Sequence, residues 1–356
     1  MIILSFDKIN QFASKVPSTP SFLRDRYFSK TGSYINGEIP VEITKNGRQV
    51  APFVAPEIGG KVMERDGKSV TVFEAPEVAP QRVITRKNIL ATEQSSDYVI
   101  VDGGATSTPE QRQAKLIRDD LVDLDAAITR REEVMCSEAL FKGQVTVIGE
   151  GYNQVIQFWD QADKPYEELA GTAKWDAPAT SDPAADIERG ISQVQQRSGY
   201  TPTELIVHPK DWALARQSQK LMDQLDTKNI SLGELNLDSK ANEQGVRVVG
   251  RIGGLTIMTY SQTVTTQDNA NGTQTPVNLV PEGYILFANP ANPTEMAYGV
   301  VQVNDVKAQQ PRFSAQKRTP NMYLNQKNPA GIVVETKCAP LPVPFVPDAF
   351  YVIKVK

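Results

Sequence analysis

The sequence predicts an α+β fold in which one long helix packs on strands and a second unit is inserted before the chain returns to strands. Three observations indicate this class. A helical pattern of unusual length covers residues 108–141, strand patterns lie on both sides of it, and helices alternate with strands from about residue 184. This order divides the chain into an arm, a projecting loop, a domain around the long helix, and an inserted unit.

Composition limits the classes of function. The chain has 356 residues, 40% hydrophobic and 22% charged, as in ordinary soluble globular proteins. Its formal net charge of -4 leaves no basic surplus to neutralise phosphates, which argues against sequence-specific DNA binding. The opening run is too short for a signal peptide, and no apolar stretch approaches the roughly 20 residues that span a bilayer. We therefore expect a protein that stays in the cytoplasm where it is made, without a membrane partner.

Residues 1–52 are predicted to form an N-terminal arm. Prolines and glycines interrupt the segment, namely Pro17, Pro20, Gly32, Gly37 and Pro40. It nevertheless carries many large apolar residues, namely Phe6, Ile9, Phe12, Phe22, Leu23, Tyr27 and Phe28. A segment that cannot bury these side chains against itself must lay them on its own body or on a neighbouring subunit.

Residues 53–92 are predicted to form an extended loop built as a β-hairpin. Apolar residues alternate from Ser69 to Phe73, and Asp66-Gly67 has the chemistry of a hairpin turn. Prolines keep the flanks out of a central sheet, and these are Pro56, Pro76 and Pro80. We interpret the segment as a long projecting loop; the alternative is an ordinary edge hairpin on a compact domain.

Residues 93–183 are predicted to form a domain around the helix at 108–141. Thr108 suits the N-cap, Pro109 suits the first helical position, and Lys142-Gly143 supplies the stop. One face carries the apolar residues Ile117, Leu121, Leu124, Ile128 and Met135, flanked by Arg130, Arg131, Glu132 and Glu133. A helix of this length must rest its apolar stripe on a sheet or on a partner.

The rest of the chain is predicted to contain an inserted unit and a return. Two strands are expected at 144–159 around the turn 149–151, and the polar stretch 160–183 marks a boundary. The unit at 184–325 is expected to hold helices at 186–197 and 211–225, and strands at 204–207, 245–261, 284–288 and 297–301. Residues 263–281 are expected to form a polar surface loop. Residues 326–356 then return to the first domain with strands at 331–339 and 351–353.

No catalytic, cofactor-binding or metal-binding residue is assigned. The single histidine, His208, cannot build a multi-histidine metal site, and we expect it to be hydrogen-bonded locally. Cys136 and Cys338 are expected to be small buried hydrophobes. The glycine pairs at 59–60, 103–104 and 253–254 lie in no phosphate-binding motif. We expect a solvated helical face to carry the aspartates Asp119, Asp120, Asp123 and Asp125, which lack calcium-loop spacing.

Four segments resemble the major capsid protein E family of tailed phages. The most specific is HPKDWALARQSQKLMDQLDTKN at 208–229. The others are VAPEIGGKVMERDG at 54–67, RREEVMCSEALFKGQVTVIGEG at 130–151 and APLPVPFVPDAFYVIKV at 339–355. They follow the family's order, and the similarity covers nearly the whole chain. None is a catalytic signature, so the resemblance indicates a fold and a structural role, not a reaction.

The resemblance implies the HK97-like fold. The long helix and terminal strands would then form a peripheral domain with the helix as its spine, and residues 184–325 an axial domain. It also implies pentamers and hexamers of one chain in an icosahedral shell around double-stranded DNA, with the hairpin loop reaching a neighbour. A procapsid that expands as DNA enters is implied, as are a portal protein, a scaffold, a decoration protein and assembly in the host bacterial cytoplasm.

Two alternatives stay open at this point. An encapsulin-like shell shares the fold but holds a cargo enzyme, and co-purifying cargo would favour it. An enzyme using the α/β unit would be a soluble monomer with a pocket, but the sequence nominates no residues for it. Some relatives join subunits covalently through lysine and asparagine, for which Lys61 or Lys68 would be the donors. We do not expect such a link, and denaturing electrophoresis of intact shells would test it.

Overall fold

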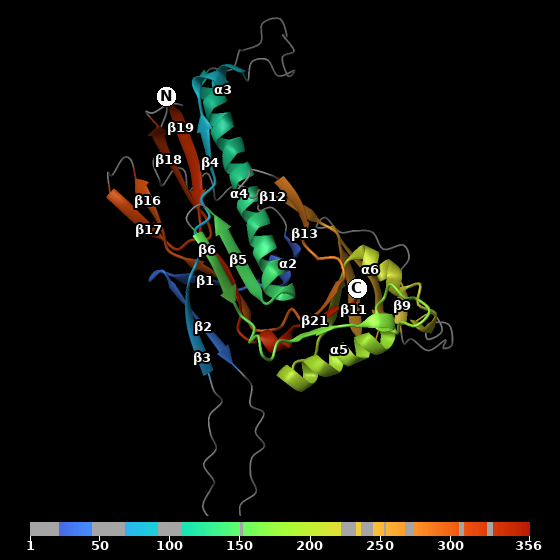
Figure 1. Ribbon diagram of the computed structural model, residues 1–356. Coiled ribbons are helices and arrows are strands. Elements are labelled where there is room, and N and C mark those ends of the chain that lie inside the picture. Colours follow the sequence, from blue (N-terminus) through green and yellow to red (C-terminus); the bar gives the residue numbers. More distant parts are fainter. Residues whose placement is uncertain are drawn as a thin grey trace, which may run out of the picture.

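The structure is a computed structural model of the chain. It describes residues 21–44, 68–91, 109–149, 152–221, 233–235, 245–252, 254–267, 274–305, 310–325 and 330–356. The body is elongated, with helix α4 (Pro109–Phe141) along its length and an α/β unit beside the lower part of the helix (Figure 1). Within these ranges, no helix is long and apolar enough to cross a membrane.

Helix α4 confirms the predicted long helix. Its first half places Ile117, Leu121 and Leu124 against a three-stranded sheet. The strands of that sheet, in order, are β18 (Thr319–Asn325), β19 (Gly331–Lys337) and β4 (Gln81–Ile84). The predicted cap, Thr108, lies outside the described residues. At the other end Gly143 has φ +61, and a Cβ there would meet the Trp159 ring, so only glycine suits this stop.

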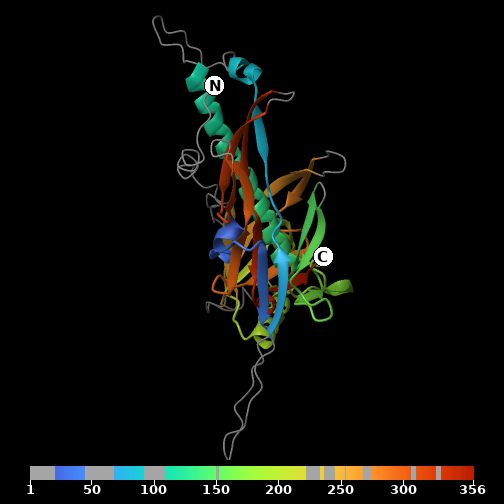
Figure 2. The ribbon, with the colours of Figure 1, turned by 90° about the vertical axis from the view of Figure 1, so that its left-hand side faces the viewer.

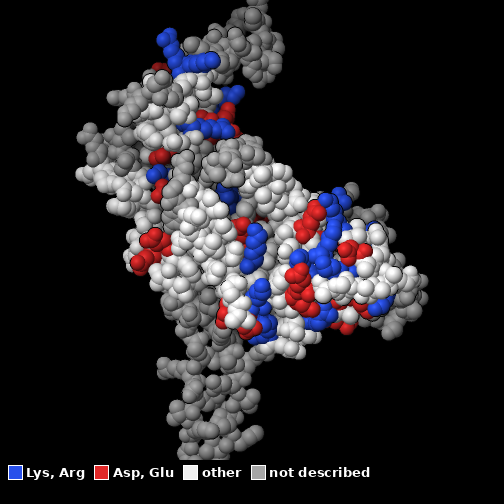
Figure 3. Space-filling model, in the orientation of Figure 1, with Lys and Arg blue, Asp and Glu red and all other residues white. Residues whose placement is uncertain are grey.

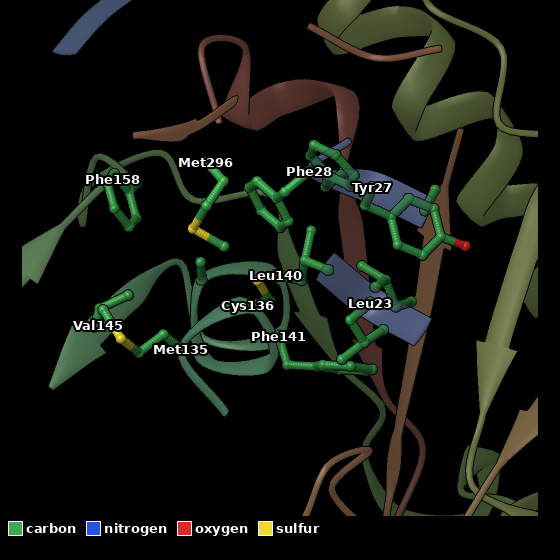
Figure 4. Close-up of a cluster of buried hydrophobic side chains, with 14 of the residues drawn as sticks. Leu23, Tyr27, Phe28, Met135, Cys136, Leu140, Phe141, Val145, Phe158 and Met296 are labelled. Atoms are coloured by element: carbon green, nitrogen blue, oxygen red, sulfur yellow. The ribbon is translucent and has the colours of Figure 1, made fainter. Parts of the chain in front are cut away.

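The second half of α4 enters the main core. Helix α2 (Phe22–Tyr27), from the expected arm, packs against it together with β15 (Thr294–Gly299). Figure 4 shows this core with Leu23, Tyr27, Phe28, Met135, Cys136, Leu140, Phe141, Val145, Phe158 and Met296. Phe22, Leu23, Tyr27 and Phe28 of the arm therefore lie on the chain's own body, one of the two outcomes expected for them.

The α/β unit is built on a seven-stranded sheet. Its strand order is β7-β21-β14-β8-β11-β10-β9. The bounds are β7 (Tyr166–Glu168), β21 (Tyr351–Lys354), β14 (Tyr284–Ala288), β8 (Glu204–Val207), β11 (Leu255–Tyr260), β10 (Val246–Ile252) and β9 (Gly233–Leu235). Helices α5 (Pro183–Ser198) and α6 (Pro209–Ala215) belong to it, and Ile187 and Val194 of α5 share a buried cluster with Phe287 of β14.

Several small sheets complete the described fold. Strand β1 (Thr31–Tyr34) runs parallel to β15, whose other neighbour is β20 (Pro340–Pro344). The two-stranded sheets are β2 (Glu38–Thr44) with β3 (Lys68–Glu74), β5 (Gln144–Gly149) with β6 (Tyr152–Gln157), β12 (Thr263–Gln267) with β13 (Gln274–Asn278), and β16 (Val301–Asp305) with β17 (Gln310–Ser314). The short helices are α3 (Arg86–Ala91), η2 (Gly171–Ala173) and η3 (Pro347–Ala349).

The projecting hairpin begins earlier than predicted. Strand β3 pairs with β2, which lies in the segment expected to be an arm. Alternation within β2 explains this, because Ile39 and Val41 are buried while Pro40 lies between them in a two-stranded ribbon that tolerates proline. The expected turn at Asp66-Gly67 lies outside the described residues, as do the glycine pairs at 59–60 and 103–104. Residues 81–91 leave the hairpin and form β4 and α3.

Two further expectations differ from the structure. Residues 263–281 were expected to form a loop, but they contain the paired strands β12 and β13. Threonine suits strands as well as surfaces, and Val264 turns inward to the main core. The helix expected at 211–225 ends at Ala215, and a turn follows before helical backbone resumes at 219. Its predicted end, at 222–225, lies outside the described residues.

The expected domain limits cross two of the observed pairings. The limit at 325–326 falls between β18 and β19, which pair along their lengths. Strand β21, expected in the returning segment, pairs with β14 of the seven-stranded sheet. By contrast, the hairpin predicted at 144–159 is present as β5 and β6, and the strand predicted at 204–207 is β8.

Candidate assembly surfaces and a buried charged joint

The single histidine holds a turn together. His208 precedes α6, and its Nδ1 accepts the backbone N–H of Lys210 at 3.3 Å, which caps the helix. Burial lowers the pKa of His208. On the same helix, the Asp211 carboxylate accepts the backbone N–H of Gly283 at 2.6 Å. These contacts confirm that the histidine is hydrogen-bonded locally. Among the described residues, no group of three or more His, Cys, Asp or Glu could hold a metal ion.

Both cysteines are buried and unpaired, as predicted. Cys136 lies in the main core beneath α2, and Cys338 follows β19. Burial raises the pKa of both thiols, so neither is activated as a nucleophile.

The aspartates of α4 are only partly a solvated face. Asp120 and Asp123 form ion pairs with Arg82 of β4, at 2.9 and 2.7 Å. Asp125 pairs with Arg318, which precedes β18. Asp120, Asp123 and Asp125 therefore connect the helix to β4 and to the residue before β18. The sequence pattern had predicted only a solvated face for them.

Glu133 of α4 caps the N-terminus of α2. One carboxylate oxygen accepts the backbone N–H groups of Phe22 and Leu23 at 3.0 and 2.7 Å, and the other accepts that of Arg24 at 3.0 Å. The hydroxyl of Tyr260 donates to the same carboxylate at 3.2 Å. Three otherwise unpaired N–H groups at the start of a helix are thus satisfied by one side chain from a distant helix. Burial raises the pKa of Glu133.

Glu132, the preceding residue, lies between two arginines. Arg24 of α2 donates to it at 2.8 Å, and Arg318 donates at 2.6 and 3.1 Å. The Tyr298 hydroxyl adds a hydrogen bond at 3.1 Å. Although burial favours the neutral carboxyl, the two guanidinium groups hold the pKa of Glu132 below its ordinary value. This side chain is fully buried, so the arginines are its essential counter-charges.

The other end of α2 is tied to the α/β unit. Arg26 forms an ion pair with Glu204 of β8, and the Tyr27 hydroxyl donates to the same carboxylate at 2.5 Å. We call Arg24, Arg26, Glu132, Glu133, Glu204 and Arg318 the charged joint. Through it, one short helix fixes the long helix α4, the α/β unit and the turn before β18 relative to one another.

The charged joint was not predicted from the sequence. Glu132 and Glu133 were placed at the flank of the apolar stripe, with Arg130 and Arg131. One signal was present, because Glu132 stands four residues after Ile128 and four before Cys136, on the buried side of the helix. The partners Arg24, Arg26 and Glu204 carry no such signal, since they are distant in sequence.

Two kinds of surface are suited to contact with other molecules. Two-stranded ribbons lie at the margins of the body, among them β2–β3 in its lower part and β12–β13 beside α4 (Figure 1). Val72 of β3 is 52% exposed, and Lys68 begins this strand, whereas Lys61 lies outside the described residues. A cleft of about 950 Å³ runs beside α4, lined by residues 76–80, by one side of α4 from Ala127 to Glu138, by β5 and by β12.

Comparison with known proteins decides the class of this chain. A family model described as phage major capsid protein E matches residues 5–355. The chain belongs to this family. Its members are structural capsid proteins, so the chain is a structural protein of the phage capsid and not an enzyme, as predicted.

Relatives and solved structures agree with this membership. The major capsid protein of Escherichia phage lambda is 25% identical over 336 residues, which cover 94% of this chain and 92% of that protein. The major capsid protein of Enterobacteria phage phi80 is 25% identical over 342 residues, with the same coverage. The putative capsid protein of a prophage of E. coli CFT073 superposes with a TM-score of 0.68 at 18% identity, over 100% of both chains. The predicted HK97-like capsid fold is therefore confirmed.

Proposed function

We propose that this chain assembles through pentamers and hexamers into an icosahedral phage head that encloses double-stranded DNA. The observation that carries the proposal is the capsid family match, which covers residues 5–355. Division of the subunit into a peripheral domain with α4 as spine and an axial domain around the capsomer centre is part of the proposal.

The shape of the subunit supports assembly into a thin wall. Seen from the side, the body is narrower than in the first view (Figures 1 and 2). Two-stranded ribbons at the margin of the body bury one face in the chain, but exposed apolar side chains on them, such as Val72 of β3 and Phe313 of β17, are available to neighbours. The charged joint keeps the long helix and the α/β unit in one fixed arrangement, as a repeating wall element requires.

The charge of the chain is consistent with weak binding between the capsid wall and packaged DNA. The net charge is -4, and the face in Figure 3 mixes acidic and basic side chains over the α/β unit. A wall without a dense basic surface would hold packaged DNA close by without binding it tightly. The proposed contact with DNA is therefore non-specific proximity.

Only membership of the capsid family supports the further partners that we propose. A portal protein, a scaffold and a decoration protein are the expected partners, and assembly would take place in the host bacterial cytoplasm before the procapsid expands. A shell that holds a cargo enzyme is the competing assembly.

Nuclease protection separates the head from the cargo shell. Particles would be purified from host cells that produce the whole set of phage proteins, treated with nuclease, and then extracted. We expect double-stranded DNA of genome length inside particles whose main protein is this chain. Particles that protect no DNA and contain a stoichiometric enzyme would contradict the proposal and support the cargo shell.

A further inference from the structure

The hairpin β16–β17 has an aromatic residue on its solvent-exposed face, where a polar residue is expected. Val301 and Val303 turn inward and are each 1% exposed, and Gln302 between them faces outward. The residue opposite Gln302 is Phe313, which is 66% exposed. Strands with one solvated face normally place polar residues there. Phe313 therefore adds little to the core of the single chain.

A second exposed side chain lies next to this hairpin. Ile35 is 75% exposed and directly follows β1, whose last residue pairs with Gly299 of β15. A Cβ on Gly37, in the same turn, would lie 3.6 Å from a methyl group of Val300. Because β16 begins immediately after Val300, the turn that contains Ile35 lies next to the start of the β16–β17 hairpin. Scattered exposed apolar residues are ordinary, but Ile35 and Phe313 are the two most exposed large hydrophobic side chains among the described residues, which indicates a contact surface.

This apolar edge lies at the margin of the body. In Figure 1 the β16–β17 hairpin and the end of β1 are at the left-hand side, and Figure 2 looks onto that side. Among the described residues, β17 pairs with β16 in a two-stranded sheet, so β17 is an edge strand. A thin wall grows by joining the margins of its subunits rather than their faces. A second copy of this chain is therefore the occupant that the position favours.

We propose that the edge formed by Ile35 and Phe313 is a contact between neighbouring copies of this chain in the shell. The inference rests on the proposed function and assigns part of it to two side chains. Since a ring of identical subunits needs head-to-tail contacts, the edge would meet a different surface of its neighbour. Each contact would be modest, and its repetition in every subunit would make it decisive for closure.

Assembly of paired variants tests the proposal. Light scattering would follow shell formation by wild type, Phe313→Ser, Phe313→Leu and Ile35→Ser, with circular dichroism to verify folding. Truncation of an aromatic anchor at an interface typically costs more than a factor of ten in affinity. We expect both serine variants to raise the protein concentration needed for assembly about tenfold or more, and the leucine control to stay near wild type. Ile35 lies in a turn, so its variant serves even if Phe313→Ser unfolds.

A thiol reporter gives an independent reading. The variant Gln302→Cys keeps Phe313, and the two native thiols are buried, so maleimide would label the new thiol alone. We expect fast labelling of unassembled subunits and strong protection in shells. Equal labelling in both states, or serine variants that assemble at the wild-type concentration, would overturn the inference while leaving the proposed function intact. Failure of the wild type to assemble, even with its scaffold co-expressed, would overturn both.

Discussion

Loss of the Glu132 charge should destabilise the subunit more than any exposed charge substitution. In Glu132→Gln, Arg24 and Arg318 would keep their burial but lose the carboxylate that now lies 2.8 and 2.6 Å from them. Removal of one partner from a buried pair costs about 3–5 kcal/mol. Each arginine retains a second acid, Asp25 at 2.7 Å for Arg24 and Asp125 for Arg318. The loss should therefore be at the lower end, about 3 kcal/mol.

Urea unfolding of unassembled subunits, followed by circular dichroism, measures this loss. With a slope of about 3 kcal/mol per molar urea, the midpoint should fall by about 1 M with the slope unchanged. The matched control is Glu282→Gln, which removes an exposed glutamate that is ion-paired with Lys210 at 2.6 Å, and it should leave the midpoint where it is. Equal midpoints for Glu132→Gln and wild type would refute the view that the buried joint needs this charge.

The same variant should change the response to acid. A lowered pKa in the folded state means that folding favours the ionised carboxylate of Glu132. Its contribution is therefore complete above the ordinary value of 4.5 and is lost as pH falls through the folded-state pKa. As pH falls through the folded-state pKa of Glu132, wild type should lose stability steeply, and Glu132→Gln should lose less. The raised pKa of Glu133 acts in the opposite sense, since its contribution weakens as pH rises.

Three further substitutions or treatments test other parts of the structure. In Glu133→Ala, three backbone N–H groups at the start of α2 lose their carboxylate acceptor. Amide exchange at 22–28, measured by mass spectrometry, should therefore accelerate while exchange in α5 stays constant. Gly190→Ala should destabilise by about 1–3 kcal/mol, in spite of alanine's helix preference, because its Cβ would lie 2.2 Å from the Phe287 ring; a rise in the urea midpoint would contradict this. Cys136 and Cys338 should resist thiol reagents in the native protein and react in urea, and rapid labelling of either without denaturant would show that the core opens.

Local patterns predicted those elements whose neighbours in space are also neighbours in sequence. Helix α4 and the β5–β6 hairpin follow from apolar spacing and turn residues within their own segments. The partner of β3 could not be found this way, because β2 lies across an intervening stretch and its segment, with Gly37 and Pro40, was interpreted as an arm. The strands β12 and β13 were missed because their polar residues were taken as a sign of a loop.

The charged joint depends on contacts that no local pattern specifies. Glu133 lies 109 to 111 positions from the amides it caps, and Arg26 lies 178 from Glu204. The chain's composition, its single histidine and its resemblance to a capsid family were enough to predict a structural role. They did not indicate which side chains hold the subunit rigid, because that depends on the packing of distant segments.

Electron microscopy of the purified protein in negative stain, with size-exclusion chromatography beside it, tests the central claim most directly. We expect closed shells, or rings of five and six subunits, from this chain alone or with its scaffold co-expressed. A strictly monomeric protein at high concentration under both conditions would contradict it.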